Sequence, residues 1–355
     1  MGPAPEGVWP VPSQTYSVEL AQQSMEASLE QFQLADELGF DWVTVAEHHY
    51  APFSLTPNPM VMAGALTQRV RRAKIALLGS NIPIQNPVRV AEEFAMLDVM
   101  TGGRVIAGML RGTPNEYITY ATNPAETRGR FEEALKLIVR AWTEPQPFGW
   151  QGRYFEYRAV SIWPRPVQQP HPPIYMSGSS PEAGEWAARN HIGVGFAVTT
   201  VPLAKQAAQH YREQAAIAGW EPTPDDVLYR LGVHVADTDE QALADLEAPT
   251  TSGTARLSSM VDRRVMAAIA ESGYHGRDVA NQSSRVLGRH SIRERIELGQ
   301  ILAGSPETVV AQVKSIKQEL GCGILDLSFH PASRDKTLHA IELFGTKVLP
   351  RIRDL

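Results

Sequence analysis

Asp41-Trp-Val-Thr-Val-Ala-Glu-His-His49 is an apolar run that ends in three adjacent titratable residues. Such a run is typical of a buried β-strand, in which alternate side chains point to opposite faces. Thr44, Ala46 and His48 then share one face, and two valines share the other with Glu47. If the valines pack on helices, the first face looks into a barrel and His48 lies at its mouth. A (β/α) barrel carries its chemistry at that end of its strands.

The composition is that of an ordinary globular protein: 355 residues, 43% hydrophobic and 20% charged. The net charge is −6 and no basic run occurs, so neither nucleic acid nor an anionic membrane is an expected partner. The single cysteine, Cys322, excludes an intramolecular disulfide and a multi-cysteine metal site, and we expect a packed thiol. Without an apolar stretch of about 18 residues or a secretion signal, the expected location is the cytoplasm.

Helical and strand patterns alternate along the chain. The predicted strands are 41–48, 74–81, 104–111, 173–178, 193–198, 228–236 and 324–329. The predicted helices are 19–38, 59–69, 88–100, 126–142, one around 185–188, 202–218, 305–320 and 335–350. Repeated βα units imply a parallel sheet. We therefore predict an α/β fold, a single (β/α)8 TIM barrel over residues 1–355 with insertions, of which seven strands are visible.

Three segments do not fit this repeat. Residues 1–17 contain four prolines and two glycines, so the first strand is not evident; it lies upstream of Met1 or is irregular. Residues 144–172 contain six prolines and are predicted to form a hairpin insertion. Residues 249–300 are rich in Ser, Thr, Arg and Gly. A connection of that length is functional or mobile, and we predict a mobile lid over the site.

The first candidates for catalysis are the titratable residues at the end of the 41–49 run. A histidine that titrates near neutrality suits proton transfer, which makes His48 the leading catalytic candidate. Glu47 and His49 are further candidates, with a structural ion pair as the alternative for Glu47. Consecutive strand histidines point in opposite directions, and no His-X-His or His-Glu-X-X-His pattern occurs, so no metal site is predicted.

A phosphate site is predicted from two strand ends. Arg111 ends a strand and Gly112 allows a turn close to a ligand, and a guanidinium forks onto phosphate oxygens. Ser177, Gly178, Ser179 and Ser180 stand between a strand and a helix, where free backbone N–H groups attract anions. Helix capping is the alternative reading of these serines.

Several motifs occur together in an order that resembles the bacterial luciferase-like, flavin-dependent monooxygenases. They are Leu34-Ala-Asp-Glu-Leu-Gly-Phe-Asp41, Glu47-His48-His49, Asn86-Pro87-Val-Arg-Val-Ala-Glu-Glu93, Gly108-Met-Leu-Arg111-Gly112, Arg130-Phe-Glu-Glu133 and Ser177-Gly-Ser-Ser180. The resemblance is dense over about 30–200 and thinner afterwards. It implies a (β/α)8 barrel, a homodimer, and reduced FMN (FMNH2) delivered by a separate NAD(P)H:flavin reductase. Oxygen would add to the flavin C4a position, and the peroxyflavin would oxygenate a small, natural-product-like organic substrate.

The resemblance also implies roles for single residues. His48 matches the active-site histidine beside the flavin. Arg111 matches an arginine on the FMN phosphate, and Arg130 matches a second one, with a helix-start ion pair as its alternative. Leu78 and Gly79 align with a non-proline cis peptide that lies against the flavin ring.

Some positions depart from the luciferases proper. Leu110 stands where they often have a reactive cysteine, and Tyr117 where they have an acidic residue, so light emission from a fatty aldehyde is not expected. We predict an aromatic or hydrophobic substrate in a pocket lined by Tyr50, Phe53, Tyr117 and His290. Two alternatives stay open: a deazaflavin-dependent oxidoreductase and a non-catalytic flavin-storing protein.

Overall fold

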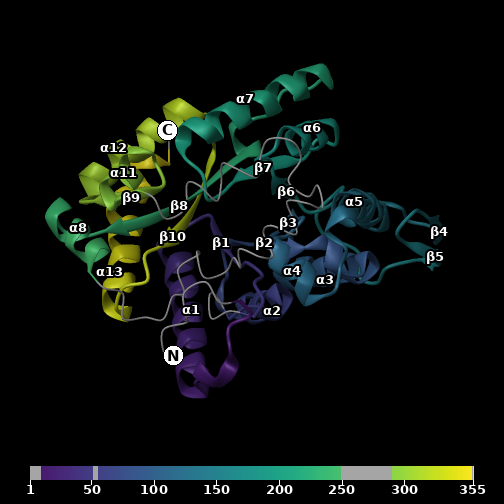
Figure 1. Cartoon of the computed structure of the whole chain (residues 1–355), viewed down its shortest axis with the longest axis horizontal. Coiled ribbons are helices and arrows are strands. Elements are labelled where there is room, and N and C mark those ends of the chain that lie inside the picture. Colours follow the sequence, from purple (N-terminus) through teal and green to yellow (C-terminus); the bar gives the residue numbers. More distant parts are fainter. Residues whose placement is uncertain (1–8, 51–54, 249–289, 354) are drawn as a thin grey trace.

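The computed structural model describes residues 9–50, 55–248, 290–353 and 355. Within them, eight strands form one sheet in the order β1-β2-β3-β6-β7-β8-β10, with β9 also paired to β8 (Figure 1). Their bounds are β1 Trp42–Thr44, β2 Lys74–Asn81, β3 Val105–Leu110, β6 Ile174–Ser177, β7 Gly193–Phe196, β8 Val227–Val235, β9 Ile301–Gly304 and β10 Ile324–Phe329. Every pairing in this sheet is parallel. The α/β class is therefore confirmed.

Helices follow most strands. They are α1 Val18–Leu38, α2 Pro59–Arg69, α3 Pro87–Thr101, α4 Pro114–Thr119, α5 Thr127–Thr143, α6 Pro181–Arg189, α7 Val201–Ile217, α8 Asp239–Glu247, α11 Ile292–Glu297, α12 Pro306–Leu320, α13 Arg334–Leu343 and α14 Leu349–Ile352, with a π-helical turn at Phe344–Val348. Single 3-10 turns lie at Ser13–Thr15, Ile82–Ile84, Pro124–Glu126 and Pro224–Asp226. Asn58, Asn86 and Ser305 cap their helices by accepting N–H groups of the first turn. None of the described helices is long and apolar enough to cross a membrane.

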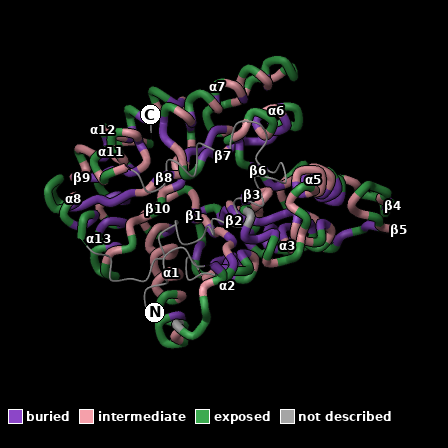
Figure 2. Tube along the Cα trace, viewed as in Figure 1, coloured by how far each residue is buried: buried purple, intermediate pink, exposed green. Residues whose placement is uncertain are grey.

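The strands separate two packing layers. One side faces the helices and forms the large core, to which Val43 and Val45 belong. Ala76, Ile106, Tyr175 and others form a smaller apolar cluster on the inner side of the curved sheet. Figure 2 shows buried strands between helices whose outer sides are exposed. The alternation predicted for the 41–49 run is found, because its odd-numbered residues from Val43 to His49 are buried and its even-numbered ones are partly exposed.

Among the described residues, β1 and β10 are the two ends of the strand path and no pairing closes the opening between them. In the described residues no strand precedes β1, and residues 1–8 lie outside them, so the two alternatives for the first strand stay predictions. A cavity of about 880 Å³ lies at this opening and is lined by both edge strands and by inner-face residues, among them Thr44, Tyr175, Arg230 and Ser328.

The predicted elements differ from the structure in a few places. β1 is shorter than predicted, although Val45 N still donates to Ala76 O beyond its end. The 144–172 segment contains the antiparallel hairpin of β4 (Phe148–Gln151) and β5 (Glu156–Val160). Of the predicted lid, 249–289 lies outside the described residues and 290–300 contains α11. The sequence pattern missed α4, α8, α11 and β9, which are all short.

Candidate functional site

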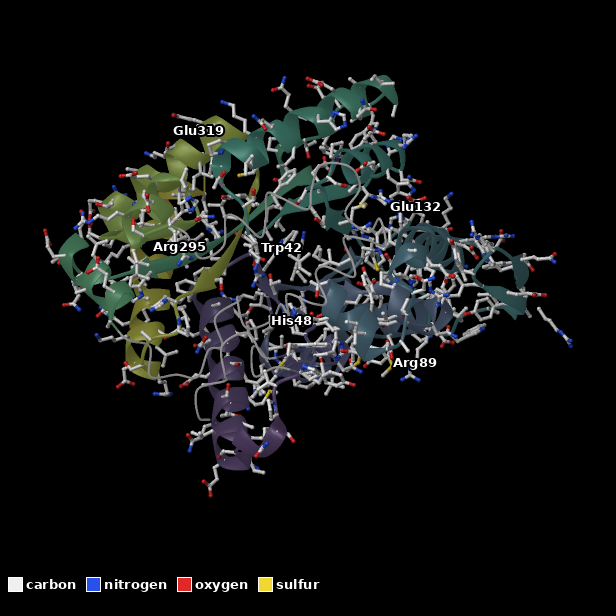
Figure 3. The ribbon with its side chains drawn as sticks, viewed as in Figure 1. Trp42, His48, Arg89, Glu132, Arg295 and Glu319 are labelled. Carbon is white, nitrogen blue, oxygen red and sulfur yellow. The ribbon has the colours of Figure 1, made fainter. Side chains whose placement is uncertain are left out.

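His48 faces a buried carboxylate at the C-terminal end of the sheet. Its Nδ1 lies 3.6 Å from Oε1 of Glu116, whose side chain is 1% exposed against 21% for His48. The other oxygen of Glu116 accepts N–H and hydroxyl hydrogen bonds from Thr113 at the start of α4. Burial by itself would raise the pKa of Glu116, but the facing imidazole of His48 and the hydrogen bonds from Thr113 lower it. The carboxylate is therefore ionised and orients the imidazole (Figure 3 labels His48).

Glu116 is a site residue that the sequence reading missed. The Thr113-x-x-Glu116 spacing is a capping box, in which each side chain bonds the backbone of the other. This pattern would have predicted the helix α4 and a carboxylate held in a fixed place. It could not have shown that the carboxylate reaches His48.

Glu47 and His49 pair on the opposite face of the run. Glu47 Oε1 lies 2.9 Å from His49 Nε2, and Oε2 accepts from Asn81 N and Gln85 Nε2 at 3.1 Å each. Both side chains are buried. The indole of Trp9 donates to the carbonyl oxygen of His49. These contacts tie the backbone on both sides of His48 to β2, so we regard Glu47 and His49 as positioning residues; their predicted catalytic roles remain predictions.

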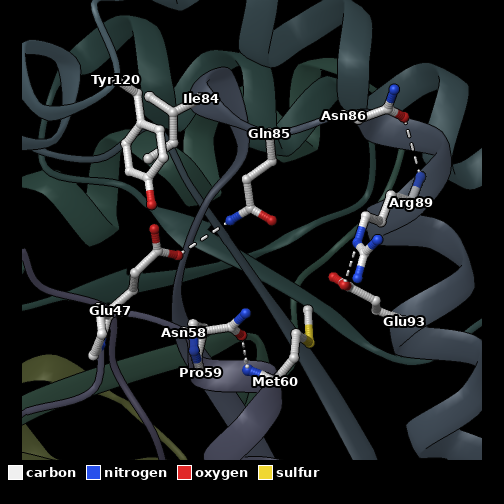
Figure 4. Close-up of a pocket in the computed structure, with 11 residues that line it drawn as sticks. Glu47, Asn58, Pro59, Met60, Ile84, Gln85, Asn86, Arg89, Glu93 and Tyr120 are labelled. Atoms are coloured by element: carbon white, nitrogen blue, oxygen red, sulfur yellow. Dashed lines mark hydrogen bonds and ion pairs between the residues drawn. The ribbon is translucent and has the colours of Figure 1, made fainter.

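A cavity of about 210 Å³ opens beside Glu47 (Figure 4). Gln85 and Tyr120 line it, and the Tyr120 hydroxyl points toward the Glu47 carboxylate in this view. Burial, together with the charge of Glu47 and the phenol of Tyr50, raises the pKa of Tyr120. Tyr120 is therefore a neutral phenol at the wall of this cavity.

Gly79 lies where β2 bulges against the end of β1. The pairing of β2 with β3 shifts register between Leu78 and Ser80, which leaves Gly79 as the extra residue. A Cβ added to Gly79 would lie 2.6 Å from both Ala46 Cα and Glu47 N. The glycine is explained by this backbone approach. The predicted cis bond at 78–79 is not found, because the cis bonds in the described chain precede Pro10, Pro164 and Pro170.

Two polar side chains follow Gly79 without partners. In the part of the chain that the structure describes, Ser80 Oγ and Asn81 Nδ2 are buried and make no hydrogen bond. Asn81 lies next to Gly112, because a Cβ built on Gly112 would lie 2.9 Å from Asn81 Oδ1. Buried polar groups are almost always satisfied. Open positions of this kind suit a heterocycle with carbonyl oxygens and ring nitrogens, and the sequence reading had missed them.

Arg128 lies beside the N-terminus of α6, and the charge of Arg111 acts on the same helix start. Gly112 has the left-handed φ of 89° that the predicted turn after Arg111 requires. At the start of α6, the pKa of Glu182 is lowered first by its own backbone N–H and then by Ser180, Arg128 and Arg111. Arg128 lies 4.0 Å from the Glu182 carboxylate. Cationic side chains beside a helix N-terminus form an anion site.

The side chain of Arg130 does not contact α6. Its Nε donates to Pro83 O at 3.2 Å, and its guanidinium lies over the rings of Phe155 and Tyr154. Glu133, its predicted ion-pair partner, instead accepts N–H groups of the β4–β5 hairpin. Residues two apart on a helix point in different directions, so Arg128 faces α6 and Arg130 does not. In the described contacts Arg128, not Arg130, lies beside the start of α6, and the phosphate-side role predicted for Arg130 stays a prediction.

The serines of the loop 177–180 have different roles. Ser180 caps α6 by accepting from Ala183 N, and Ser177 Oγ donates to Ser179 Oγ at 3.4 Å. Gly178 is explained by packing, because a Cβ there would lie 2.8 Å from Val194 Cβ. Ser177 and Ser179 therefore keep hydroxyls at the anion site, and Ser180 shapes the helix start.

The predicted substrate pocket is mostly not supported. Tyr117 is fully buried and its hydroxyl donates to the carbonyl oxygens of Arg111 and Gly112, so it supports the turn, and its predicted place in the pocket stays a prediction. Tyr50 is exposed and packs beside Trp9. His290 precedes α11, and Phe53 lies outside the described residues. No metal-binding group of His, Cys, Asp or Glu is found among the described residues.

Comparison with known proteins shows which family the chain belongs to. The luciferase-like monooxygenase family profile matches residues 7–322. The 4-hydroxyprotoasukamycin monooxygenase of Streptomyces nodosus subsp. asukaensis is 28% identical over 92% of this chain and 87% of its own. The F420-dependent glucose-6-phosphate dehydrogenase of Amycolatopsis mediterranei is 27% identical over 90% and 92%. Protein y4wF of Sinorhizobium fredii is 31% identical, and that match covers 52% of this chain and about half (53%) of the relative.

Solved structures show the same fold. The monooxygenase RslO1 of Streptomyces bottropensis superposes with a TM-score of 0.74, at 25% identity, over 93% of this chain and 94% of its own. The oxygenating constituent of 3,6-diketocamphane monooxygenase of Pseudomonas putida, in complex with FMN, also has a TM-score of 0.74, at 18% identity, over 98% and 96%.

Proposed function

Because the chain belongs to the luciferase-like monooxygenase family, whose named relatives include monooxygenases, we propose that it is the oxygenase component of an FMN-dependent two-component system. A separate NAD(P)H:flavin reductase would supply reduced FMN. With O2, the enzyme would oxygenate a small organic substrate. One observation carries this proposal: the unsatisfied side chain of Asn81, next to that of Ser80, adjoins the turn at Gly112 after Arg111, and Arg128 lies beside the N-terminus of α6, where the charge of Arg111 also acts on Glu182.

In this proposal, one part of the site would bind the FMN ring and another part would bind its phosphate. Ser80 and Asn81 would hydrogen-bond the polar edge of the ring, and Arg111 and Arg128 would bind the phosphate. Reduced FMN, when bound, supplies the electrons that activate O2. The His48–Glu116 pair would hold or accept a proton at the ring, because the ionised carboxylate stabilises the imidazolium. The buried Glu47–His49 pair keeps the His48 backbone in place.

The deazaflavin alternative has support from the F420-dependent relative. The anaerobic titration that tests our proposal therefore uses both reduced FMN and reduced F420. We expect FMN to bind more tightly and O2 to be consumed when a reductase and substrate are present. Tighter F420 binding would overturn the FMN assignment. Tight FMN binding without oxygen-dependent product from any substrate or reductase would favour the storage alternative.

FMN binding by arginine variants tests where the phosphate of FMN binds. Arg111→Ala and Arg128→Ala should each weaken FMN binding by about ten- to a hundredfold, because a hydrogen bond to a charged group contributes about 1.5–3 kcal/mol. Arg189→Ala, at the exposed C-terminal end of α6, is the matched control and should bind FMN normally. Riboflavin, which has no phosphate, should bind all four proteins with similar affinity. Unchanged FMN binding in both Arg111→Ala and Arg128→Ala would place the phosphate elsewhere.

We also infer a homodimer through α2 and α3. Val61 on α2 and Met96, Val99 and Met100 on α3 are exposed apolar side chains on adjacent helices. Contiguous exposed apolar surface marks an interaction site, and a second copy is the commonest partner. Sedimentation should show a dimer for the unaltered chain and a monomer for Met96→Asp. A monomeric unaltered chain would contradict this inference.

A further inference from the structure

A second histidine pair lies at the carboxyl ends of β8 and β10. The parallel register runs to Val233 opposite Phe329, and His330 N donates to Val233 O at 2.9 Å. His330 therefore follows β10 directly beside His234. The centroids of the two imidazole rings are 5.7 Å apart, in an edge-to-face arrangement. His234 is 1% exposed and His330 is half-buried, so neither ring is fully hydrated.

Among the described residues, one carboxylate contacts this pair, and its charge is already balanced. Nε2 of His234 lies 3.0 Å from Oδ2 of Asp245 on α8. The other oxygen of Asp245 accepts hydrogen bonds from Lys336 Nζ on α13 and from Gln241 Nε2. Burial would raise the pKa of Asp245, but these hydrogen bonds lower it, so the carboxylate is ionised. The ammonium group of Lys336 offsets its charge, which leaves no spare anion for a further cation.

A partly buried guanidinium approaches the pair from α11. Burial lowers the pKa of Arg295, as expected for a cation held away from water (Figure 3 labels Arg295). The neighbouring carboxylate of Glu294 is occupied, because it accepts the N–H and hydroxyl groups of Ser291. Burial, then His234 and then the charge of Arg295 lower the pKa of His330, and Asp245 opposes them only in part. A proton on His330 would therefore meet a positive surrounding.

The helix that bears Arg295 is held by a small apolar contact. Ile292 and Ile296 of α11 pack on Leu246 of α8 and on Ile301 of β9, and both isoleucines stay partly exposed. α11 has only six residues, and a helix of that length is not stable without packing. A modest repulsion at Arg295 is therefore enough to displace this helix.

We propose that His330 is a pH-sensitive latch for α11: its neutral ring lets α11 pack on α8 and β9, and its protonation weakens that packing. The proton comes from solvent and adds a third cation to Lys336 and Arg295, with Asp245 as the anion that contacts the pair. His234 is held by Asp245 and cannot turn away. The smallest rearrangement that relieves the repulsion moves His330 and α11 outward, where water hydrates both charges.

Urea unfolding of the full chain without flavin measures the cost of this proton. Because the pKa of His330 is lowered in the fold, the full stability is present above its ordinary value of 6.5 and is lost as the pH falls toward the lowered pKa. The urea midpoint should therefore fall between about pH 7.5 and about pH 5.5. In His330→Gln this fall should be smaller by up to about 0.5 M urea, the limit for a ring that takes no proton.

The matched control is His339→Gln on α13. It removes an exposed imidazole that pairs with Asp237, and an exposed pair of this kind contributes little to stability. Its midpoint should fall with pH as much as that of the unaltered protein. An equal fall in His330→Gln and the unaltered protein would overturn the proposal.

Hydrogen exchange measured at both pH values, corrected for the chemical exchange rate, shows where the protein opens. In acid the amide groups of 292–300 should exchange about tenfold faster, and those of α5 should not change. His330→Gln should lack this increase. If that variant does not fold, Arg295→Gln carries the test, because it removes the repelling charge and should also lack the increase. Exchange that rises equally in α5, or does not rise in 292–300, would overturn the proposal. Slower exchange in acid would also overturn it, because protonated His330 would then donate to the unpartnered Nδ1 of His234.

Discussion

Replacing Gly79 by alanine tests how the end of β2 supports the site. The new Cβ would lie 2.6 Å from Ala46 Cα and Glu47 N, both backbone atoms of the run that bears His48. A flexible side chain could move away, but this backbone is tied through Glu47 to Asn81. Overpacking costs about 1–3 kcal/mol, and we expect the upper end, about 3 kcal/mol, because no rotamer change relieves the contact.

Urea unfolding followed by tryptophan fluorescence measures this cost. With a slope of about 3 kcal/mol per M, the midpoint should fall by about 1 M urea. The control is Gly64→Ala in the middle of α2, where an added Cβ meets nothing within 4 Å. It should stabilise the protein by about 0.5–1 kcal/mol, because alanine favours the helix and restricts the unfolded chain.

The same variant should also disturb the ring-binding end of the site. A shift of the backbone at Ala46 displaces His48, so reduced FMN should bind Gly79→Ala about tenfold more weakly and Gly64→Ala normally. The reasoning is refuted if Gly79→Ala changes the free energy of unfolding by less than about 0.5 kcal/mol, the usual range of a neutral surface substitution.

Three further predictions follow from buried groups and turns. The Asp36 carboxylate accepts hydrogen bonds from the backbone N–H groups of residues 71–73. Burial opposes its ionisation, but these hydrogen bonds lower its pKa below the ordinary value of 3.8. Ionised Asp36 therefore stabilises the fold above pH 3.8, and this stabilisation is lost as the pH falls through the lowered pKa. Asp36→Asn should therefore cost about 2 kcal/mol at neutral pH and progressively less in acid, by urea unfolding; an equal loss at both would contradict this. Burial raises the pKa of the Cys322 thiol to about 11, so iodoacetamide should label it only after unfolding, and fast labelling of native protein would disprove this. Gly112 has a φ of 89°, and the Cβ that Gly112→Ala adds would lie 2.9 Å from Asn81 Oδ1, so the turn must shift. This variant should therefore bind FMN about tenfold more weakly in a flavin titration, and normal binding would show that the turn is not part of the site.

Local pattern was enough to predict most of the fold. Buried alternation located the run at 41–49, and Asn-Pro and Ser-Pro pairs marked the starts of α2, α3, α6 and α12. These signals work because capping, helix periodicity and strand alternation depend on residues within a few positions of one another. The short elements α4 and β9 carry too few residues for a period to show, and β1 is shorter than predicted because it pairs on one edge.

The sequence by itself determined the family, the α/β class, and the stretches after β1 and β3 where His48 and Arg111 stand. The tertiary structure alone decided which side chains meet there. Glu116 reaches His48 across 68 positions, and Asp245 and Lys336 reach His234 from two different helices. The choice of Arg128 over Arg130 likewise depends on which side of α5 faces α6. Such contacts join residues that are distant in the chain, and only the packing of helices against the sheet brings them close together.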